Sequence, residues 1–354
     1  MTKIDEQVKE NRKKFRVDHF DMVVSEYIQR KENKELILNP PYQRLFRWGI
    51  ESQSELIESI LIGIPIPPIF VFQNGEAKWE IIDGLQRTTS LINFLKEGSE
   101  QKFTGCQIIT ELNDKTFSQL PENIQRIVKN TRIRIELVEE TDDIFSQYLL
   151  FNRLNANGEK LEAQEIRNFL IYKLNNAFYA NIQILGNSKE FKETLGLKLD
   201  RIKKQENVEY VLKFFLGRDI SNSTEAPKYD RIEDLITNET EQFLKKNNQE
   251  FLNNEIEVFK KTFNIIYSIF GANSFRWHHP KINNIANTFS IAIGISCILD
   301  KVNQSNQETL IKDITRQYFE SDEYKKITAR GYSPTKRMYE LNRYSAKFFK
   351  GAIK

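Results

Sequence analysis

The chain has 354 residues, of which 40% are hydrophobic and 12% aromatic, and this supports about two folded domains with real cores. No apolar run approaches the about 18 residues of a membrane span, and the charged N-terminus lacks an apolar signal core. The two cysteines, Cys106 and Cys297, are far apart and outside any CxxC spacing. The composition therefore excludes wholesale disorder and a membrane span, and it favours a reducing, cytoplasmic setting.

Charge is unevenly distributed although the net charge is only +3. From Lys325 to Lys354 there are nine Lys or Arg residues and one acid, with Tyr and Phe between them. Basic groups can neutralise phosphates and aromatic rings can stack on bases, so this segment predicts a DNA-binding surface that includes Lys336, Arg337 and Arg343. The alternative is a solvated basic helix whose aromatic side chains pack against the rest of the protein.

The first half of the chain mixes helix and strand patterns. Residues 1–15 read as a frayed arm or leading helix, 19–28 as a short helix, and 35–38 as a brief strand. Apolar residues at helical spacing predict a core-facing helix that begins near Glu51 and ends by Gly63.

A hairpin follows, in which strands 69–72 and 79–82 flank a turn at 73–76. Next come a helix from Asp83 to about residue 95 and a strand at 132–138. The region is therefore expected to be a mixed α/β domain.

Beyond residue 143 the periodicity is helical. The predicted helices cover 144–151, 163–174, 207–215, 232–245, 255–269, 285–299 and 308–319. We therefore expect an α+β chain, with a mixed domain at 15–175 followed by an all-helical domain at 176–354.

Residues 83–90, Asp-Gly-Leu-Gln-Arg-Thr-Thr-Ser, connect the hairpin to the next helix. A strand that breaks at Asp-Gly and enters a helix presents backbone N–H groups and the positive end of the helix dipole, which suit an anion. Arg87 adds a guanidinium for a phosphate, Gln86 adds a donor and acceptor, and Asp83 could hold a divalent cation or a water. The alternative is an ordinary turn in which Asp, Thr and Ser cap the helix.

Two other segments carry recognition groups. Tyr42–Trp48 places Gln43 and Arg44 among aromatic residues, which can hold a phosphate and a base or simply pin a surface loop. The loop at 151–161 gathers asparagines, Asn155 among them, which can bind a purine or ribose or form turns. The three histidines form no metal-binding pattern, and no P-loop is present, so no metal site is expected from the sequence.

Four ordered blocks resemble one protein family. They are Pro41–Trp48, Leu56–Pro68, Asp83–Arg87, and Phe151–Leu161 with Glu165. Together they resemble the N-terminal domain of GmrSD-type, modification-dependent restriction endonucleases.

The resemblance implies a ParB/sulfiredoxin-like mixed α/β fold that binds a nucleoside triphosphate, with Mg²⁺ as a candidate cation, and leaves hydrolysis open. Carried over by motif, the nucleotide-binding residues are Gln43, Arg44, Asp83, Gly84, Gln86, Arg87, Thr88 and Asn155. Any catalytic work would fall to Asp83, Gln86 and Arg87. The family's commonest middle residue in the Asp-Gly-x-Gln-Arg motif is Gln; Leu85 stands here, and a side chain directed into the core would be tolerated.

Relatives often end in a His-Asn-His nuclease domain, but no histidine follows His279, so this mechanism of DNA cleavage is not expected here. The leading hypothesis is a nucleotide-dependent regulator or sensor of a bacterial anti-phage system. Its partners would be DNA and a separate nuclease subunit, and a homo-oligomer is left open. The alternatives are a non-enzymatic DNA-binding module of the same fold and a nuclease with an unrecognised site.

Overall fold

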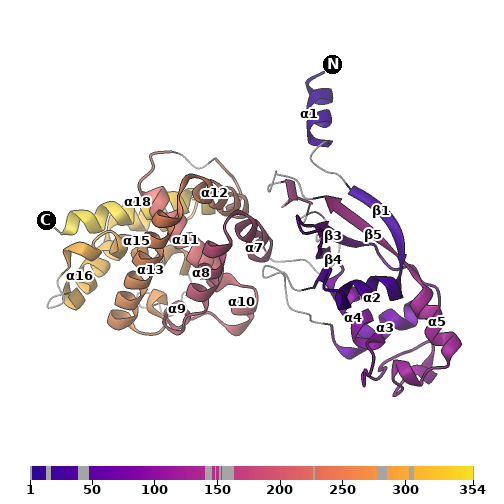
Figure 1. Cartoon of the computed structure of the whole chain (residues 1–354). Coiled ribbons are helices and arrows are strands. Elements are labelled where there is room, and N and C mark those ends of the chain that lie inside the picture. Colours follow the sequence, from indigo (N-terminus) through magenta and orange to yellow (C-terminus); the bar gives the residue numbers. More distant parts are fainter. Residues whose placement is uncertain are drawn as a thin grey trace. The chain divides into compact units, whose positions relative to one another are not determined.

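The computed structural model describes residues 2–12, 17–38, 48–139, 146–147, 149–150, 153, 163–225, 228–276, 285–302 and 307–353. The chain forms two compact units, Met1–Leu161 and Glu162–Lys354, whose elements are labelled in Figure 1. The sequence placed the domain boundary near residue 175. In the structure the helix that begins at Ala163 belongs to the second unit.

A five-stranded sheet forms the centre of the first unit. Its strands are β1 (Val17–Val23), β2 (Leu36–Ile37), β3 (Ile69–Gln73), β4 (Trp79–Asp83) and β5 (Arg132–Glu139). The spatial order is β1-β5-β3-β4-β2, with antiparallel β1/β5 and β3/β4 pairs and parallel β5/β3 and β4/β2 pairs. The sheet is therefore mixed, and the predicted hairpin and the predicted strand at 132–138 are confirmed.

Helices α2 to α5 lie together on one side of this sheet (Figure 1). The helices of the unit are α1 (Lys3–Arg12), α2 (Val24–Glu32), α3 (Ile50–Leu61), α4 (Leu85–Leu95) and α5 (Glu122–Asn130). Ile57 of α3 and Val71 and Ile135 of the sheet are completely buried in the shared core. Helix α1 buries no residue, because its sequence has no apolar face.

The predicted helix over 19–28 is wrong for its first half. Residues 17–23 form β1, which pairs with β5 along its whole length, and the helix begins only at Val24. Phe20 and Met22 are more buried than His19 and Asp21, the two-residue alternation of an edge strand. The pairing partner lies more than 100 residues away, so the local pattern could not reveal it.

The second unit is all-helical, as expected. Its helices are α7 (Ala163–Leu174), α8 (Asn176–Asn187), α9 (Lys189–Leu195), α10 (Leu199–Lys203), α11 (Glu206–Ser221), α12 (Ile232–Lys246), α13 (Gln249–Phe270), α14 (Ile285–Thr288), α15 (Ser290–Ser296), α16 (Gln307–Glu320), α17 (Asp322–Thr328) and α18 (Pro334–Ala352). The expected single helix over 285–299 is divided into α14 and α15. Half of the expected helix over 144–151 is described, and the described residues 146, 147, 149 and 150 are helical.

Helix α11 is the centre of the second unit. It contacts α8, α12, α15 and α18, and its buried residues lie on every side of the helix. A helix that buries residues on every side must be surrounded by other helices to be stable. Phe214 packs edge-on against Phe259 with ring centroids 5.1 Å apart, one of many aromatic contacts in this core.

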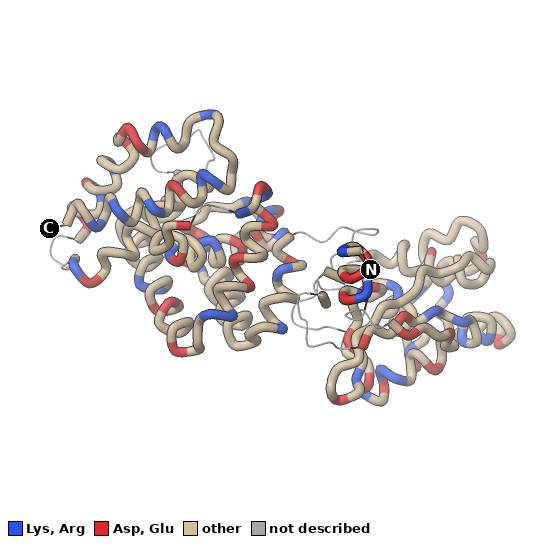
Figure 2. Tube along the Cα trace, turned by 90° about the horizontal axis from the view of Figure 1, so that it is seen from above, with Lys and Arg blue, Asp and Glu red and all other residues tan. Residues whose placement is uncertain are grey.

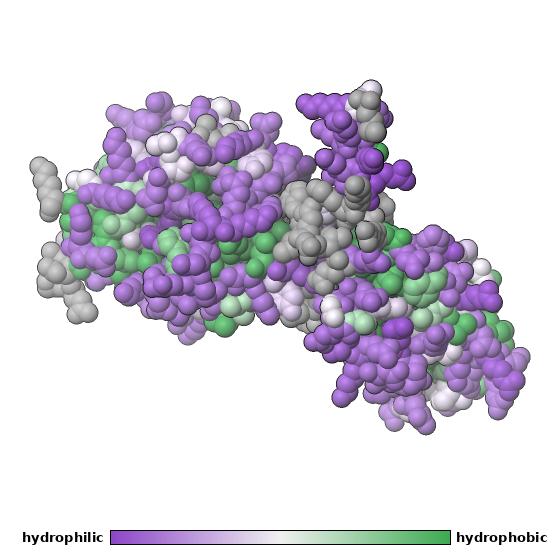
Figure 3. Space-filling model, turned by 45° about the horizontal axis from the view of Figure 1, so that its top comes forward, coloured by the Kyte–Doolittle hydropathy of each residue, from purple (hydrophilic) through white to green (hydrophobic). Residues whose placement is uncertain are grey.

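The surface in view in Figure 3 is largely hydrophilic over both units. None of the helices in the described part of the chain is long and apolar enough to cross a membrane.

Candidate functional site

Strand β4 passes into α4 through a single glycine, Gly84. Its φ of +101° lies in the left-handed region, which side chains with a Cβ adopt at a cost. A Cβ at this position would meet the side chain of Ile69 at 3.1 Å, and Arg87 Nη2 at 3.4 Å. Backbone geometry and close packing therefore both require glycine here, and no side chain of residue 84 screens the start of the helix.

A β-bulge sets the direction of the preceding residue. Phe70 pairs with Asp83 and Val71 pairs with Ile81, so Ile82 is an extra residue in β4. Because side chains alternate along a strand, the bulge allows Ile81 and Ile82 both to be buried. It also leaves the Asp83 carboxylate at the surface, with 36% of the side chain exposed.

Arg87 connects the strand end to the proline-rich segment before β3. Its Nη2 donates to Asp83 Oδ2 at 2.8 Å, and its Nη1 donates to the carbonyl oxygens of Pro67 at 2.5 Å and Pro68 at 3.1 Å. Only 12% of the Arg87 side chain is exposed. The guanidinium of Arg87, in the first turn of α4, is thus held in a fixed position.

Gln86 attaches the start of α4 to the segment that precedes α3. Its Oε1 accepts a hydrogen bond from the backbone N–H of Trp48 at 3.0 Å. Gln53 of α3 donates from Nε2 to the carbonyl of the same Trp48, also at 3.0 Å. The expected site residues Gln43 and Arg44 come just before Trp48 in the chain and lie outside the described residues, as does Asn155.

Thr88 and Leu85 face the interior. The Thr88 side chain is completely buried, and its Oγ1 lies 3.0 Å from the hydroxyl of Tyr27, which is also completely buried. Burial raises the pKa of Tyr27, so its hydroxyl stays protonated. Thr88 therefore anchors α4 to α2 rather than presenting its hydroxyl at the helix start, whereas Leu85 joins the apolar core as the motif comparison anticipated.

The three basic residues expected to contact DNA all belong to α18, but they differ in their surroundings. Arg337 donates from Nε to Ile327 O and from Nη2 to Ala329 O, at the end of α17. Arg343 donates to the carbonyl of Glu225, and its guanidinium carbon lies 5.1 Å from the centre of the Tyr339 ring. Lys336 is exposed, and its Nζ lies 5.1 Å from the centre of the Tyr332 ring.

The aromatic residues of α18 pack inward. Tyr339 and Phe349 are buried, and Phe349 lies 5.8 Å from the ring of Tyr318, which is also buried. The rings of Tyr339 and Phe349 therefore cannot stack on bases, whereas Tyr344 and Phe348 are half-buried. DNA binding by this segment stays a prediction. Figure 2 shows acidic and basic residues interspersed along both units.

A mixed α/β unit with a strand–glycine–helix junction, followed by an all-helical unit, defines an α+β protein. Residues 24–172 match the model of the GmrSD restriction endonuclease N-terminal domain. This segment of the chain is therefore a GmrSD N-terminal domain, a component of restriction-like defence systems. No curated protein and no solved structure matches the chain. The match begins at α2 and ends in α7, so β1 completes the sheet from outside the matched segment.

Sequence reasoning missed the groups that hold the motif in place. Tyr27, Gln53, Trp48 and the carbonyls of Pro67 and Pro68 all bond to residues of α4 or to their partners. The run Ile64–Pro68 did carry a signal, since a proline-rich segment donates few backbone hydrogen bonds and leaves carbonyl oxygens for other donors.

Proposed function

We propose that the first unit binds a nucleoside triphosphate at the start of α4, and that the nucleotide regulates a restriction-like defence system. The observation that carries the proposal is the Gly84 junction. There an eleven-residue helix begins beside a fixed guanidinium and the carboxylate of Asp83, whose side chain is 36% exposed. Backbone N–H groups of a first helical turn have no acceptor within the helix and favour an anion.

The two oxygens of the Asp83 carboxylate would have different roles. Oδ2 accepts from Arg87, whereas Oδ1 accepts no hydrogen bond from the described parts of the chain. Oδ1 is therefore the atom that would meet a cation or orient a water, while Oδ2 keeps Arg87 in place. Arg87 would stabilise phosphate charge, and Gln86 would shape the site through its bond to Trp48.

Mg²⁺ would bind here only together with the nucleotide, whose phosphates would supply further ligands. The described residues bring no three His, Cys, Asp or Glu side chains together to hold a metal ion. Mg²⁺ commonly uses one or two carboxylates together with phosphate oxygens and waters, and Asp83 can supply one such ligand. When bound, the ion would neutralise phosphate charge; the remaining positioning falls to Arg87 and the backbone of α4.

The test is a thermal-shift and phosphate-release assay on the full chain with ATP, GTP, CTP and UTP, each with and without Mg²⁺. A tightly bound nucleotide should raise the unfolding temperature, and release of phosphate would add hydrolysis to binding. Arg87→Ala should abolish the shift. Arg126→Ala is the matched control, because Arg126 forms an i, i+4 pair with Glu122 in the same unit but is largely exposed.

A failure to see any nucleotide effect would contradict the proposal. If DNA then bound with an affinity that falls steeply with salt, the unit would be a DNA-binding module without nucleotide chemistry. Cleavage of plasmid DNA by the chain alone would instead indicate a nuclease.

A further inference from the structure

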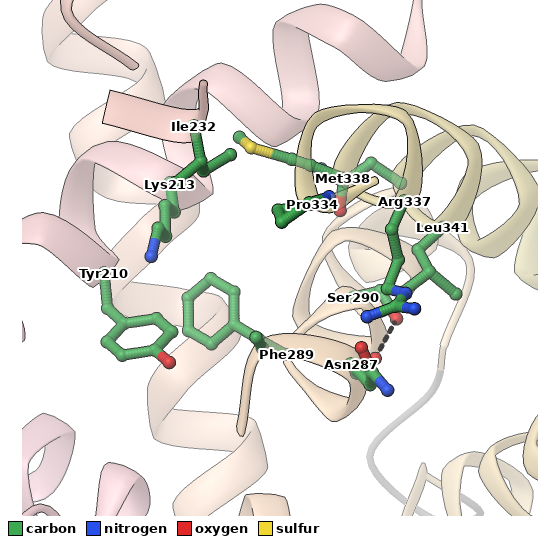
Figure 4. Close-up of a pocket in the computed structure, with 12 residues that line it drawn as sticks. Tyr210, Lys213, Ile232, Asn287, Phe289, Ser290, Pro334, Arg337, Met338 and Leu341 are labelled. Atoms are coloured by element: carbon green, nitrogen blue, oxygen red, sulfur yellow. Dashed lines mark hydrogen bonds between the residues drawn. The ribbon is translucent and has the colours of Figure 1, made fainter. Parts of the chain in front are cut away.

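A cavity of about 250 Å³ lies in the second unit, between helices α11, α12, α14, α15 and α18 (Figure 4). Ile232 and Met338 lie across it from the ring of Phe289, and these three give it apolar walls. Lys213, Arg337 and Asn287 supply polar groups. Ligand pockets commonly have such apolar walls and a few placed polar groups, and this cavity lies just below their usual volume of roughly 300–1,000 Å³. This one suits a molecule no larger than a mononucleotide.

The electrostatic environment of the cavity is positive. None of its described lining residues is Asp or Glu. Lys213 Nζ lies 2.6 Å from Glu209 Oε1, but the same carboxylate also pairs with Arg167, whose side chain is completely buried. One carboxylate thus serves two cations, and the cluster keeps a net positive charge beside the cavity.

The groups of this cluster shift each other's pKa values towards the charged forms. Burial would raise the pKa of Glu209, but Lys213 and Arg167 lower it to about 2. Burial would lower the pKa of Lys213, but Glu209 and Tyr210 raise it above its usual value. Glu209 and Lys213 are therefore both charged at neutral pH.

Arg337 contributes a second positive charge that no carboxylate neutralises. Within the described residues its Nε and Nη2 bond only to the carbonyl oxygens of Ile327, Ala329 and Tyr332, and it forms no ion pair. Its Nη1 donates no hydrogen bond to the same described residues. That donor belongs to a side chain that lines the cavity and is fixed by its other nitrogens.

Asn287 carries the strongest sign of a ligand. Its side chain is only 6% exposed, and its Oδ1 is buried without a hydrogen-bond partner among the residues that the structure describes. A buried polar atom without a partner costs about 1–3 kcal/mol, and such atoms are uncommon in native proteins. Asn287 lines the same side of the cavity as Arg337 (Figure 4). Its Oδ1 is covered in this rotamer, so a ligand that accepts from Arg337 would reach Oδ1 after a rotation about χ2 of Asn287, which is a broad, two-fold torsion.

We propose that this cavity binds a small organic anion with a flat or apolar body. Its phosphate or carboxylate contacts Arg337, an N–H or O–H group of the ligand donates to Asn287 Oδ1, and the body lies between Phe289 and Met338. Arg337, which no carboxylate of the described residues neutralises, and the net positive cluster of Arg167, Lys213 and Glu209 favour an anion. The aromatic and aliphatic walls favour a ring, and the unpartnered oxygen requires a donor. The site belongs to the second unit and does not depend on nucleotide binding at α4.

Isothermal titration calorimetry with the full chain tests the proposal through four probes. UMP combines a ring with a phosphate, and salicylate combines a ring with a carboxylate and a hydroxyl. Uridine keeps the ring without the charge, and inorganic phosphate keeps the charge without the ring. UMP or salicylate should bind at least about tenfold more tightly than uridine and inorganic phosphate. The preferred member of the first pair tells whether the natural ligand carries phosphate or carboxylate, and equal weakness of all four probes would overturn the proposal.

Variants then locate the binding. Arg337→Gln and Asn287→Ala should each weaken the tighter probe by about tenfold or more. Lys336→Gln is the matched control, because Lys336 is the preceding residue of α18, is exposed and does not line the cavity. Arg87→Ala in the other unit should leave this binding unchanged, which separates the cavity from the proposed nucleotide site.

The Asn287 side chain makes no hydrogen bond to the described residues, so Asn287→Ala still tests the proposal if Arg337→Gln disturbs the end of α17. Unchanged binding in Asn287→Ala would sink the assignment.

Discussion

Arg87 Nη2 lies 2.8 Å from Asp83 Oδ2, and the pair joins the last residue of β4 to the first turn of α4. The same guanidinium reaches the carbonyls of Pro67 and Pro68, at the approach to β3. Two segments on either side of the hairpin are thereby held at the start of the helix. The residues proposed to meet a nucleotide are consequently also residues that hold the local fold together, and experiments must separate the two roles.

Arg87→Ala should lower the free energy of unfolding by about 1–2 kcal/mol, since it removes charged hydrogen bonds to groups that are only partly exposed. The measurement is a urea titration of the full chain. Arg126→Ala should change stability by less than about 0.5 kcal/mol, because its pair with Glu122 is largely exposed. Equal effects of the two substitutions would mean that the Arg87 contacts contribute little.

Gly84→Ala should destabilise the protein by about 1–3 kcal/mol, since the new Cβ would require a strained backbone and meet Ile69 at 3.1 Å. Gly75→Ala in the hairpin turn is the control, because no atom lies within 4 Å of a Cβ there and no positive φ is found. Thermal unfolding of the two variants gives the comparison. A tolerated Gly84→Ala would remove the argument that this junction needs glycine.

Cys106 should react slowly with iodoacetamide in the folded protein. Burial, together with nearby Glu58, raises the pKa of its thiol from about 9 to about 11. At pH 8 the rate should be on the order of a hundredfold below that of the unfolded chain in urea, as the thiolate is the reacting form. Mass spectrometry of the Cys106 peptide measures both rates.

The raised pKa of Cys106 also makes the free energy of unfolding depend on pH. Because the folded pKa lies above the unfolded one, the contribution of Cys106 is complete below pH 9 and is lost as the pH rises towards 11. Cys106→Ser should flatten this alkaline part of the stability curve, and an unchanged curve would contradict the assignment.

The lowered pKa of Glu209 should make the free energy of unfolding fall at acidic pH. Its pKa falls from 4.5 to about 2 in the folded protein, so its stabilising contribution is present above pH 4.5 and is lost as the pH falls towards 2. The loss should amount to about 2–3 kcal/mol and should be absent in Glu209→Gln. Urea titrations between pH 6 and pH 2.5 measure it. Glu308→Gln is the control, since Glu308 forms an exposed i, i+4 pair with Lys312 at the same 2.6 Å separation, and its removal should leave the acid dependence intact.

Elements whose signals are local were predictable. The alternation in Arg132–Glu139, the turn between β3 and β4 and the spacing of apolar residues in α3 each lie within one short window of sequence. The prediction for β1 was wrong because the strand depends on pairing with β5, which lies far along the chain. Helix α18 shows a related limit, since its charge pattern fits DNA binding and core packing equally until the neighbours of Tyr339 and Phe349 are known.

By itself the sequence determined the α+β class, the strand–glycine–helix motif and the membership of residues 24–172 in a restriction-system family. These follow from periodicity and from short motifs, which are properties of neighbouring residues. Only the tertiary structure decided that Thr88 faces Tyr27, that Arg87 bonds to Pro67, and that Asn287 lies buried beside Arg337 in a cavity. Burial and hydrogen-bond partners depend on segments that are distant in the chain, and folding alone brings those segments together.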